Sequence, residues 1–212
     1  MKTARNSELK TFEHAMAGFG MWWRSIQWED VAASVREFIE SFAIAAILTT
    51  FILLFVARSF VVDGSSMYPT LENRQRLLVE VISYRFREPK RGEIIVFNQG
   101  DRRRLIKRVI GLPDDLVEIR SGVVYINGYP LDEAFIPENA FADYGPVFVP
   151  QDHYFVLGDN RNNSEDSRGS VGFVSKDLVI GKAVLRFWPF SKIAIFKVPQ
   201  GYQEQEFNEY WQ

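Results

Sequence analysis

A run of seventeen residues without a charged side chain, SFAIAAILTTFILLFVA, extends from Ser41 to Ala57, between Glu40 and Arg58. A helix that crosses the hydrocarbon core of a bilayer needs roughly 17–25 such residues. The run also lacks the polar stripe of a helix that packs on a globular core. Arg58 can extend its charge toward water along its aliphatic stem, and SFVV continues the apolar character. We therefore expect a transmembrane anchor helix over residues 41–60, and consider a buried core helix the weaker alternative.

The residues before this run are mixed in character and too many for the n-region of a signal peptide. No A-x-A motif follows the run, so we expect an uncleaved anchor that crosses the membrane once. Basic residues set the orientation, and those of residues 1–40 favour a cytoplasmic N-terminus, with the rest of the chain outside the plasma (inner) membrane. The stretch MWWRSIQWEDVAASVREFIESF predicts either an amphipathic interfacial helix or a helical lead-in to the anchor. The basic residues concerned are Lys2, Arg5, Lys10, Arg24 and Arg36.

Beyond Arg58 the pattern changes to short strands and turns. GEIIVF, LIKRVI, LVEIR and VVYI are β-branched or alternating runs, and polar turns such as NQGD and GLPDD separate them. The pair Asn127-Gly128 is a strong signal for a two-residue hairpin. The sequence thus predicts a mainly β, antiparallel, barrel-like extracytoplasmic domain over residues 61–198 and a polar, peripheral tail over 199–212.

The composition excludes several kinds of chemistry. The chain has no Cys and only two His, which excludes disulfides, thiolate catalysis, Cys-based zinc sites and multi-His metal sites. Its net charge of −2 gives no support for nucleic-acid binding, which needs a basic face. We expect no metal and no cofactor, so an enzyme of this composition would work with hydroxyls, carboxylates and amines.

Lys107, in LIKRVI, is one candidate for catalysis. Strand alternation places it on one face with Leu105 and Val109, where burial would lower its pKa. The cationic side chains of residues 102–104 and Arg108 would act in the same direction. A neutral lysine can be a general base toward a hydroxyl, although most strand lysines extend to water instead.

Two polar segments flank this strand in the sequence. Ser66, in DGSSMYPTL, follows a glycine in a turn and is either a nucleophile or an ordinary turn or cap serine. The segment GDNRNNSEDSR, residues 158–168, has no apolar side chain and could be only a solvated loop. An ion pair between Asp166 and Arg168 would hold this loop while Ser164 points elsewhere.

The order of these segments closely resembles that of the type I signal peptidases: an apolar span, GSSMYPTL, RGEIIVF, IKRVIGLPDD and GDNRNNSEDSRGSVGFV. The similarity extends from about Ser59 to Phe196, and the motifs are highly specific in combination. It implies a membrane-anchored serine endopeptidase with a Ser–Lys dyad, Ser66 as nucleophile and Lys107 as general base. Its substrates would be exported preproteins, cut after an A-x-A site, and its further partners the lipid bilayer and the protein-export machinery.

The resemblance also implies supporting roles around the dyad. Ser164 matches a family serine that hydrogen-bonds the lysine and orients it. Asp166 and Arg168 match a supporting ion pair, and Asp159 belongs to the same motif. The aromatic segment FWPFSKIAIF would either face the membrane or be buried in the β domain.

For substrate recognition, the resemblance implies shallow pockets for small side chains and an oxyanion hole. The backbone N–H of Ser66 would be one oxyanion donor. Some relatives carry a second donor on a serine at the position of Gly64, which this chain lacks. Asp114 stands where the family usually has a glycine, and Asp tolerates a positive φ better than most residues. The positions that match pocket residues, each an equally good core residue, are Val62, Leu71, Leu77 and Ile106.

Three rival functions are weighed against this one. A self-cleaving regulator of the repressor type shares the Ser–Lys dyad but would need a DNA-binding segment where the apolar run lies. A His-based serine hydrolase would use His153 beside Asp152, an arrangement that is more often structural. The non-enzyme alternative is a membrane-anchored, β-rich binding or assembly module, in which Ser66 would be inert.

Overall fold

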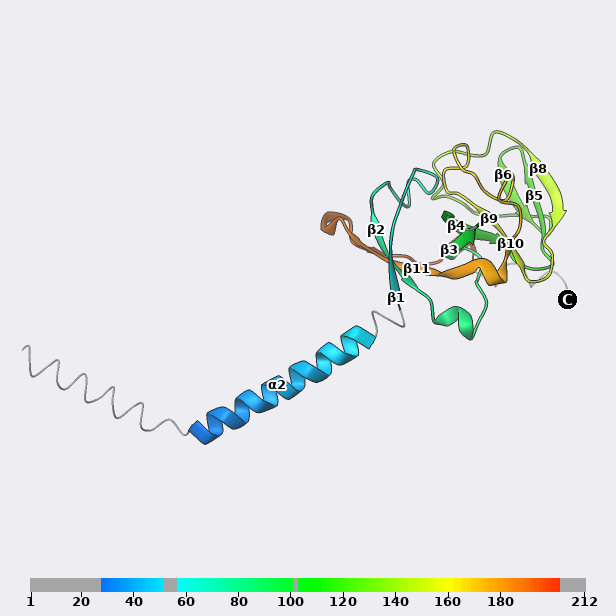
Figure 1. The fold of residues 1–212 in the computed structure, drawn as a ribbon. Helices are drawn as coiled ribbons and strands as arrows, with labels where there is room; N and C mark the ends of the chain where they lie inside the picture. The colour runs from blue at the N-terminus through cyan, green and yellow to red at the C-terminus, as the bar shows by residue number, and fades with distance from the viewer. Residues whose placement is uncertain (1–27, 52–56, 101–102, 203–212) are drawn as a thin grey trace, which may run out of the picture. The chain divides into compact units, whose positions relative to one another are not determined.

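The computed structural model describes residues 28–51, 57–100 and 103–202 (Figure 1). Helix α2, Trp28–Phe51, begins in the charged segment WEDV and ends within the apolar run. Arg36 and Glu40, one turn apart, form an ion pair on it at 2.8 Å. Its apolar side chains are exposed, from 52% at Val35 to 73% at Phe38. Among the described helices, none combines the length and apolar character needed to cross a membrane.

The expected anchor over residues 41–60 differs from the structure at its end. Residues 41–51 are helical, 52–56 lie outside the described residues, and Ala57–Val61 form strand β1. β1 pairs antiparallel with β2, Arg76–Glu80, from Ala57↔Glu80 to Val61↔Arg76. Residues 57–60 therefore belong to the β domain, because SFVV has high strand propensity and the ladder with β2 satisfies its backbone groups.

Two antiparallel sheets build the β domain in the described part of the chain, which confirms the mainly β, antiparallel expectation. The order of the larger sheet is β1-β2-β11-β3-β4-β9-β10, with β12 on β11. Among the described strands, no pair closes this sheet into the expected barrel. The smaller sheet has the order β7-β6-β5-β8. The remaining strands of the larger sheet are β3 Ile94–Gln99, β4 Arg103–Gly111, β9 His153–Leu157, β10 Val174–Ser175, β11 Val179–Trp188 and β12 Ala194–Ile195. Those of the smaller sheet are β5 Leu116–Arg120, β6 Val123–Ile126, β7 Tyr129–Pro130 and β8 Tyr144–Phe148, and the 3₁₀ turns are Ser83–Arg85, Lys176–Leu178, Phe190–Lys192 and Gln200–Tyr202.

Two turn predictions are confirmed in the smaller sheet and at its entrance. Asn127 and Gly128 both have positive φ, 54° and 89°, and join β6 to β7 through the pair Ile126↔Tyr129. Asp114, in place of a glycine, has φ 68°. Its carboxylate accepts a hydrogen bond from Gln151. An Asp side chain stabilises this conformation locally, which explains why the substitution is tolerated.

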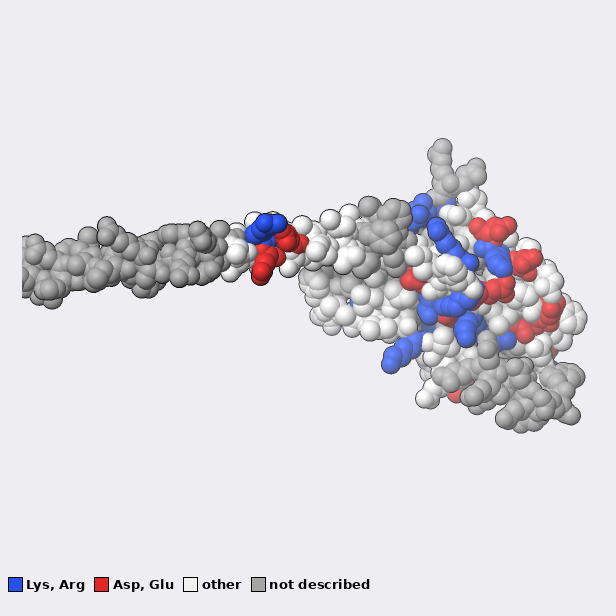
Figure 2. All heavy atoms as spheres, turned by 90° about the horizontal axis from the view of Figure 1, so that it is seen from below, with Lys and Arg blue, Asp and Glu red and all other residues white. Residues whose placement is uncertain are grey.

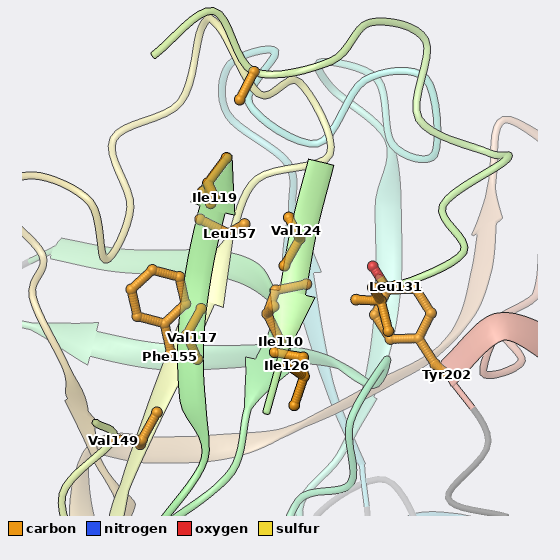
Figure 3. Packing of buried hydrophobic residues seen from close by; sticks show 11 residues of the cluster. Ile110, Val117, Ile119, Val124, Ile126, Leu131, Val149, Phe155, Leu157 and Tyr202 are labelled. Carbon is orange, nitrogen blue, oxygen red and sulfur yellow. The ribbon is translucent and has the colours of Figure 1, made fainter. Parts of the chain in front are cut away.

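The tail expected over residues 199–212 is not peripheral at its start. Tyr202, at the end of a short 3₁₀ turn, is 1% exposed and packs in the core of the smaller sheet beside Leu131 (Figure 3). The chain approaches closely there: a Cβ on Gly201 would lie 2.6 Å from that of Asp132. The large apolar ring of Tyr202 gains more from this burial than the surrounding polar sequence suggests.

Charges of both signs are mixed over the β domain. Figure 2 shows Lys and Arg side chains interspersed with Asp and Glu on the face in view. That face does not present the uninterrupted basic stripe that nucleic-acid binding requires.

Candidate active site

Strand β4 brings Lys107 into the interior of the larger sheet. It lies between β3 and β9, with Lys107 paired to Ile95. Leu105 and Val109, two residues away on either side, pack in one core cluster, while Ile106 packs in another. This agrees with the predicted alternation. Lys107 is only 2% exposed, so its side chain does not extend to water.

A closed loop between β1 and β2 presents Ser66 to this lysine. Two backbone hydrogen bonds, Val62 N to Gln75 O and Arg74 N to Val62 O, join the ends of the loop. Met67, next to the serine, is 1% exposed and fixes the loop on the core. The resulting distance between Lys107 Nζ and Ser66 Oγ is 2.7 Å. The two candidate groups, far apart in sequence, are thus in direct hydrogen-bond contact.

The environment of Lys107 favours its neutral form. Burial lowers the pKa of Lys107 from 10.5 to about 8, and Arg103 acts in the same direction, whereas Asp166, Glu165 and Asp159 oppose them. Arg108 does not act as the free cation that the sequence suggested, because it forms an ion pair with Asp159. An amine with this pKa is partly unprotonated near neutral pH and can accept the proton of the serine hydroxyl.

The polar loop 158–168 lies against the Ser66 turn. Asn160 donates two hydrogen bonds to it, from its backbone N to Ser66 O at 3.0 Å and from Nδ2 to Ser65 O at 3.2 Å. Gly158 lies in the closest approach, where a Cβ would fall 2.6 Å from Ser164 Cβ and also collide with Ser66 O. Only glycine fits between the two segments, so the loop and the serine turn form one unit.

Two of the ion pairs that this loop forms involve its aspartates, Asp166 and Asp159. Arg168 and Asp166 form the bidentate pair that the sequence suggested, at 2.8 Å from Nε and 2.7 Å from Nη2. Asp166 also accepts the backbone N–H of Gly158 at 3.1 Å. Asp159 pairs with Arg108 at 2.7 and 2.9 Å, and both side chains are almost fully buried. The sequence analysis did not predict the ion pair between Asp159 and Arg108. Strand alternation places Arg108 on the face opposite to Lys107, which could have indicated a separate partner for it.

The position of Ser164 differs from the expectation. Its Oγ is buried and has no hydrogen-bond partner within the described residues, so the expected bond to Lys107 is absent. The side chain packs on Gly158 instead, and Lys107 donates to Ser66.

A cavity of about 100 Å³ opens beside Ser66 and Lys107. Three of the four expected pocket residues, Val62, Leu77 and Ile106, line it. Leu71 does not, because it is fully buried in the core cluster behind them. A space of this size accommodates a small side chain. The other lining residues are Phe60, Val61, Asp63, Val96, Arg104 and Leu105.

The remaining candidates concern the oxyanion hole and His153. Nothing in the described part of the chain accepts the backbone N–H of Ser66, which leaves it available to a developing oxyanion. The N–H of Gly64 is occupied, since it donates to Asn73 Oδ1 at 3.1 Å. The ring of His153 contacts the carbonyl of Gln151, 2.7 Å from Nδ1. The hydrogen-bond partner of Ser66 is Lys107 and not His153.

The chain is similar to several known proteins. Residues 35–188 match the family model of the signal peptidases, peptidase S26. The chain is 48% identical over 158 residues to "Probable signal peptidase I-2" of Synechocystis sp., covering 71% of this chain and 72% of the relative. It is 40% identical over 171 residues to "Signal peptidase I S" of Bacillus subtilis, covering 76% and 92%. A crystal structure of a signal peptidase I from Enterococcus faecalis covers 46% of this chain and 98% of its own, with 37% identity and a TM-score of 0.42.

The family match covers well over half of the chain, and the relatives align over most of their own length. The contact between Ser66 and Lys107 lies inside the matched region. The chain therefore belongs to the signal peptidase family, the S26 serine peptidases, and is a signal peptidase I that removes signal peptides from exported proteins.

Proposed function

We propose that this signal peptidase I works with Ser66 as nucleophile and Lys107 as general base. The observation that carries the proposal is the 2.7 Å contact between Lys107 Nζ and Ser66 Oγ. The lowered pKa of the lysine, about 8, supports it, because an ammonium group cannot take the serine proton. A Ser–Lys pair of this kind replaces the serine–histidine pair of other serine peptidases.

In the reaction, Ser66 Oγ attacks the carbonyl carbon of the scissile bond while Lys107 accepts its proton. The oxyanion that forms is stabilised by the N–H of Ser66. The C–N bond then breaks, and the lysine returns the proton to the leaving amine, which becomes the N-terminus of the mature protein. A water molecule, deprotonated by Lys107, hydrolyses the ester and restores the serine. No metal or cofactor takes part in any of these steps.

The small cavity accounts for an A-x-A cleavage site. The small side chains at the first and third positions before the cut would lie against the cavity lined by Val62, Leu77 and Ile106, which admits a methyl group. Leu71 contributes from behind, as a core residue that fixes the position of this wall. A side chain that extended into the wall formed by these residues would have to displace a packed core, which is costly.

The polar loop would support the dyad from the side. The ion pairs of Asp166 with Arg168 and of Asp159 with Arg108 hold the backbone around Gly158 in place. Ser164, on the same loop, has a hydroxyl without a partner in the described part of the chain, which can turn toward the lysine once Lys107 has accepted the Ser66 proton. These residues act through the position and the protonation of Lys107.

We also propose that the enzyme works at the outer surface of the plasma (inner) membrane, anchored by the apolar run that begins at Ser41. The apolar run and the exposed apolar side chains of α2 support this placement. Residues 1–40 would then be cytoplasmic or interfacial. The bilayer and the protein-export machinery are the partners that such a position implies.

Cleavage of a preprotein with an A-x-A site, in detergent, tests the dyad. We expect the wild type to cut after the second alanine and Ser66→Ala and Lys107→Ala to be inactive although folded. Ser65→Ala is the matched control, because the neighbouring hydroxyl interacts with Asn163 and should be dispensable. The wild-type rate should rise with pH through about 8 as the lysine loses its proton. An active Ser66→Ala would refute the assignment, and a wild type inert on several such substrates would favour a binding module.

A further inference from the structure

The C-terminal turn reaches the catalytic loop through a chain of buried polar contacts. The hydroxyl of Tyr202 donates a hydrogen bond to the carboxylate of Glu133. The same carboxylate accepts two bonds from the guanidinium of Arg161, one of them at 2.6 Å. Arg161 is 3% exposed and Tyr202 1%, so solvent does not replace these contacts. Tyr202 lies beyond residues 35–188, the region that matches the family model.

Arg161 carries this connection into the active site. Its Nε donates to the carbonyl of Gly158 at 3.1 Å, and its own carbonyl accepts a bond from Arg168. Gly158 is the residue packed between Ser66 O and Ser164. The position of Glu133 is thereby coupled to the backbone that encloses the Ser66–Lys107 pair.

The turn is also packed too closely to shift without affecting its neighbours. A Cβ on Gly92 would lie 2.8 Å from Val198 and 2.9 Å from Tyr202 Cβ. The Tyr202 ring lies 5.7 Å from that of Phe135, which in turn is 4.5 Å from the guanidinium of Arg108. Figure 3 shows Tyr202 at one side of the core formed by β5 and β6. The Tyr202 ring thus fixes the position of the C-terminal turn, and the Tyr202 hydroxyl connects this turn to Glu133.

We propose that the C-terminal turn, residues 198–202, is a latch that positions the catalytic loop, with Tyr202 and Glu133 as positioning residues acting through Arg161. The proposal rests on the Ser66–Lys107 assignment made above. Releasing the latch would let the loop move away from the serine turn and admit water beside the lysine. Among the described residues, the charged groups that influence the pKa of Lys107 most are Asp166, Glu165, Asp159 and Arg103, and three of these four lie on the latched loop. The latch therefore affects both the geometry of the dyad and the protonation of its base.

Steady-state cleavage of the A-x-A preprotein by the full chain, as a function of pH, tests the latch. Tyr202→Phe keeps the ring and removes the hydroxyl, and Arg161→Lys keeps the charge and removes the Nε donor to Gly158. We expect kcat to fall about threefold in the first and about tenfold in the second, with KM unchanged. Better solvation of the lysine raises its pKa, whereas the retreat of Asp166, Glu165 and Asp159 lowers it. Burial is the largest of these influences, so the acid limb of the kcat profile should move upward, by about half a pH unit or more.

Tyr154→Phe is the matched control for Tyr202→Phe. Tyr154 is fully buried in a different core cluster, and its hydroxyl has no partner within the described residues. Its variant should keep the wild-type profile. Equal effects of the two Tyr→Phe changes, or a wild-type kcat and pH profile in folded Tyr202→Phe or Arg161→Lys, would overturn the latch.

The failure of the latch and the failure of the dyad give different results. An active Lys107→Ala would remove the basis of the dyad whatever the latch variants do. An inactive Lys107→Ala together with a wild-type profile in the latch variants would overturn the latch alone. Should Tyr202→Phe not fold, Arg161→Lys decides by the same readouts.

Discussion

Replacing Gly158 by alanine would place a methyl group between the two halves of the active site. The new carbon would lie 2.6 Å from Ser164 Cβ and closer still to Ser66 O, whereas Cβ atoms do not approach other atoms within 3.0 Å. Ser66 O cannot move away freely, because it also accepts the N–H of Asn160 at 3.0 Å. The serine turn and the loop must therefore separate.

The size of the effect follows from this geometry. The contact between Lys107 and Ser66 is already only 2.7 Å long, so a displacement approaching 1 Å would break it. A misplacement of about 1 Å can cost about 100-fold in rate, and overpacking of this kind costs about 1–3 kcal/mol of stability. We expect Gly158→Ala to remain folded, with kcat reduced about 100-fold.

The assay is cleavage of the A-x-A preprotein, with thermal unfolding recorded in parallel. Gly169→Ala is the matched control on the same loop, because its Cβ would meet only Asp166 O, at 3.9 Å. We expect the control to cleave at the wild-type rate. A Gly158→Ala enzyme that cleaves as fast as Gly169→Ala would refute the tight packing described for this loop.

Two further predictions concern stability, measured by denaturant unfolding as a function of pH. The pKa of Lys107 is about 8 in the folded chain and 10.5 otherwise, so its burial penalty is full below pH 8 and disappears above 10.5. Lys107→Met should therefore stabilise the inactive protein by about 3 kcal/mol at neutral pH, and an unchanged unfolding free energy would contradict this. Burial raises the pKa of Glu93, but hydrogen bonds from Arg87 and Lys182 lower it from 4.5 to about 2 overall. The stabilisation by the Glu93 carboxylate is present above pH 4.5 and lost as the pH falls through 2. Glu93→Gln should therefore lower the free energy of unfolding by about 3 kcal/mol at neutral pH and by little in strong acid. A loss that does not depend on pH would contradict this assignment.

Local signals predicted much of the β domain and of the site. Asn127-Gly128 determines its hairpin by itself, because both residues must adopt positive φ. Strand alternation around Lys107 predicted its burial, since apolar neighbours two residues away share its face. Ser66 was found through the order of several motifs along the chain and not through its own turn, which alone resembles many others.

Features that depend on tertiary contacts were not predictable. Residues 57–60 read as the end of an apolar helix until β2 is available to pair with them. Leu71 is apolar like Val62, Leu77 and Ile106, so the sequence does not distinguish it from these cavity-lining residues. Only the packing of the folded chain places Leu71 behind the cavity wall. Tyr202 stands in a polar segment, and its burial depends on Glu133 and the glycines that face it. Each case is decided by a partner distant in sequence.

The adjacency of Lys107 and Arg108 on β4 has a consequence for how the enzyme becomes active. The two side chains serve opposite faces of one strand, the first at Ser66 and the second at Asp159. A shift of β4 by one residue during folding, in one of the two directions, would move Arg108 into the place of Lys107. The serine would then face a guanidinium, which stays protonated and cannot act as a base. A chain whose central strand is out of register in this way would therefore have no base beside Ser66, and we expect it to be inactive.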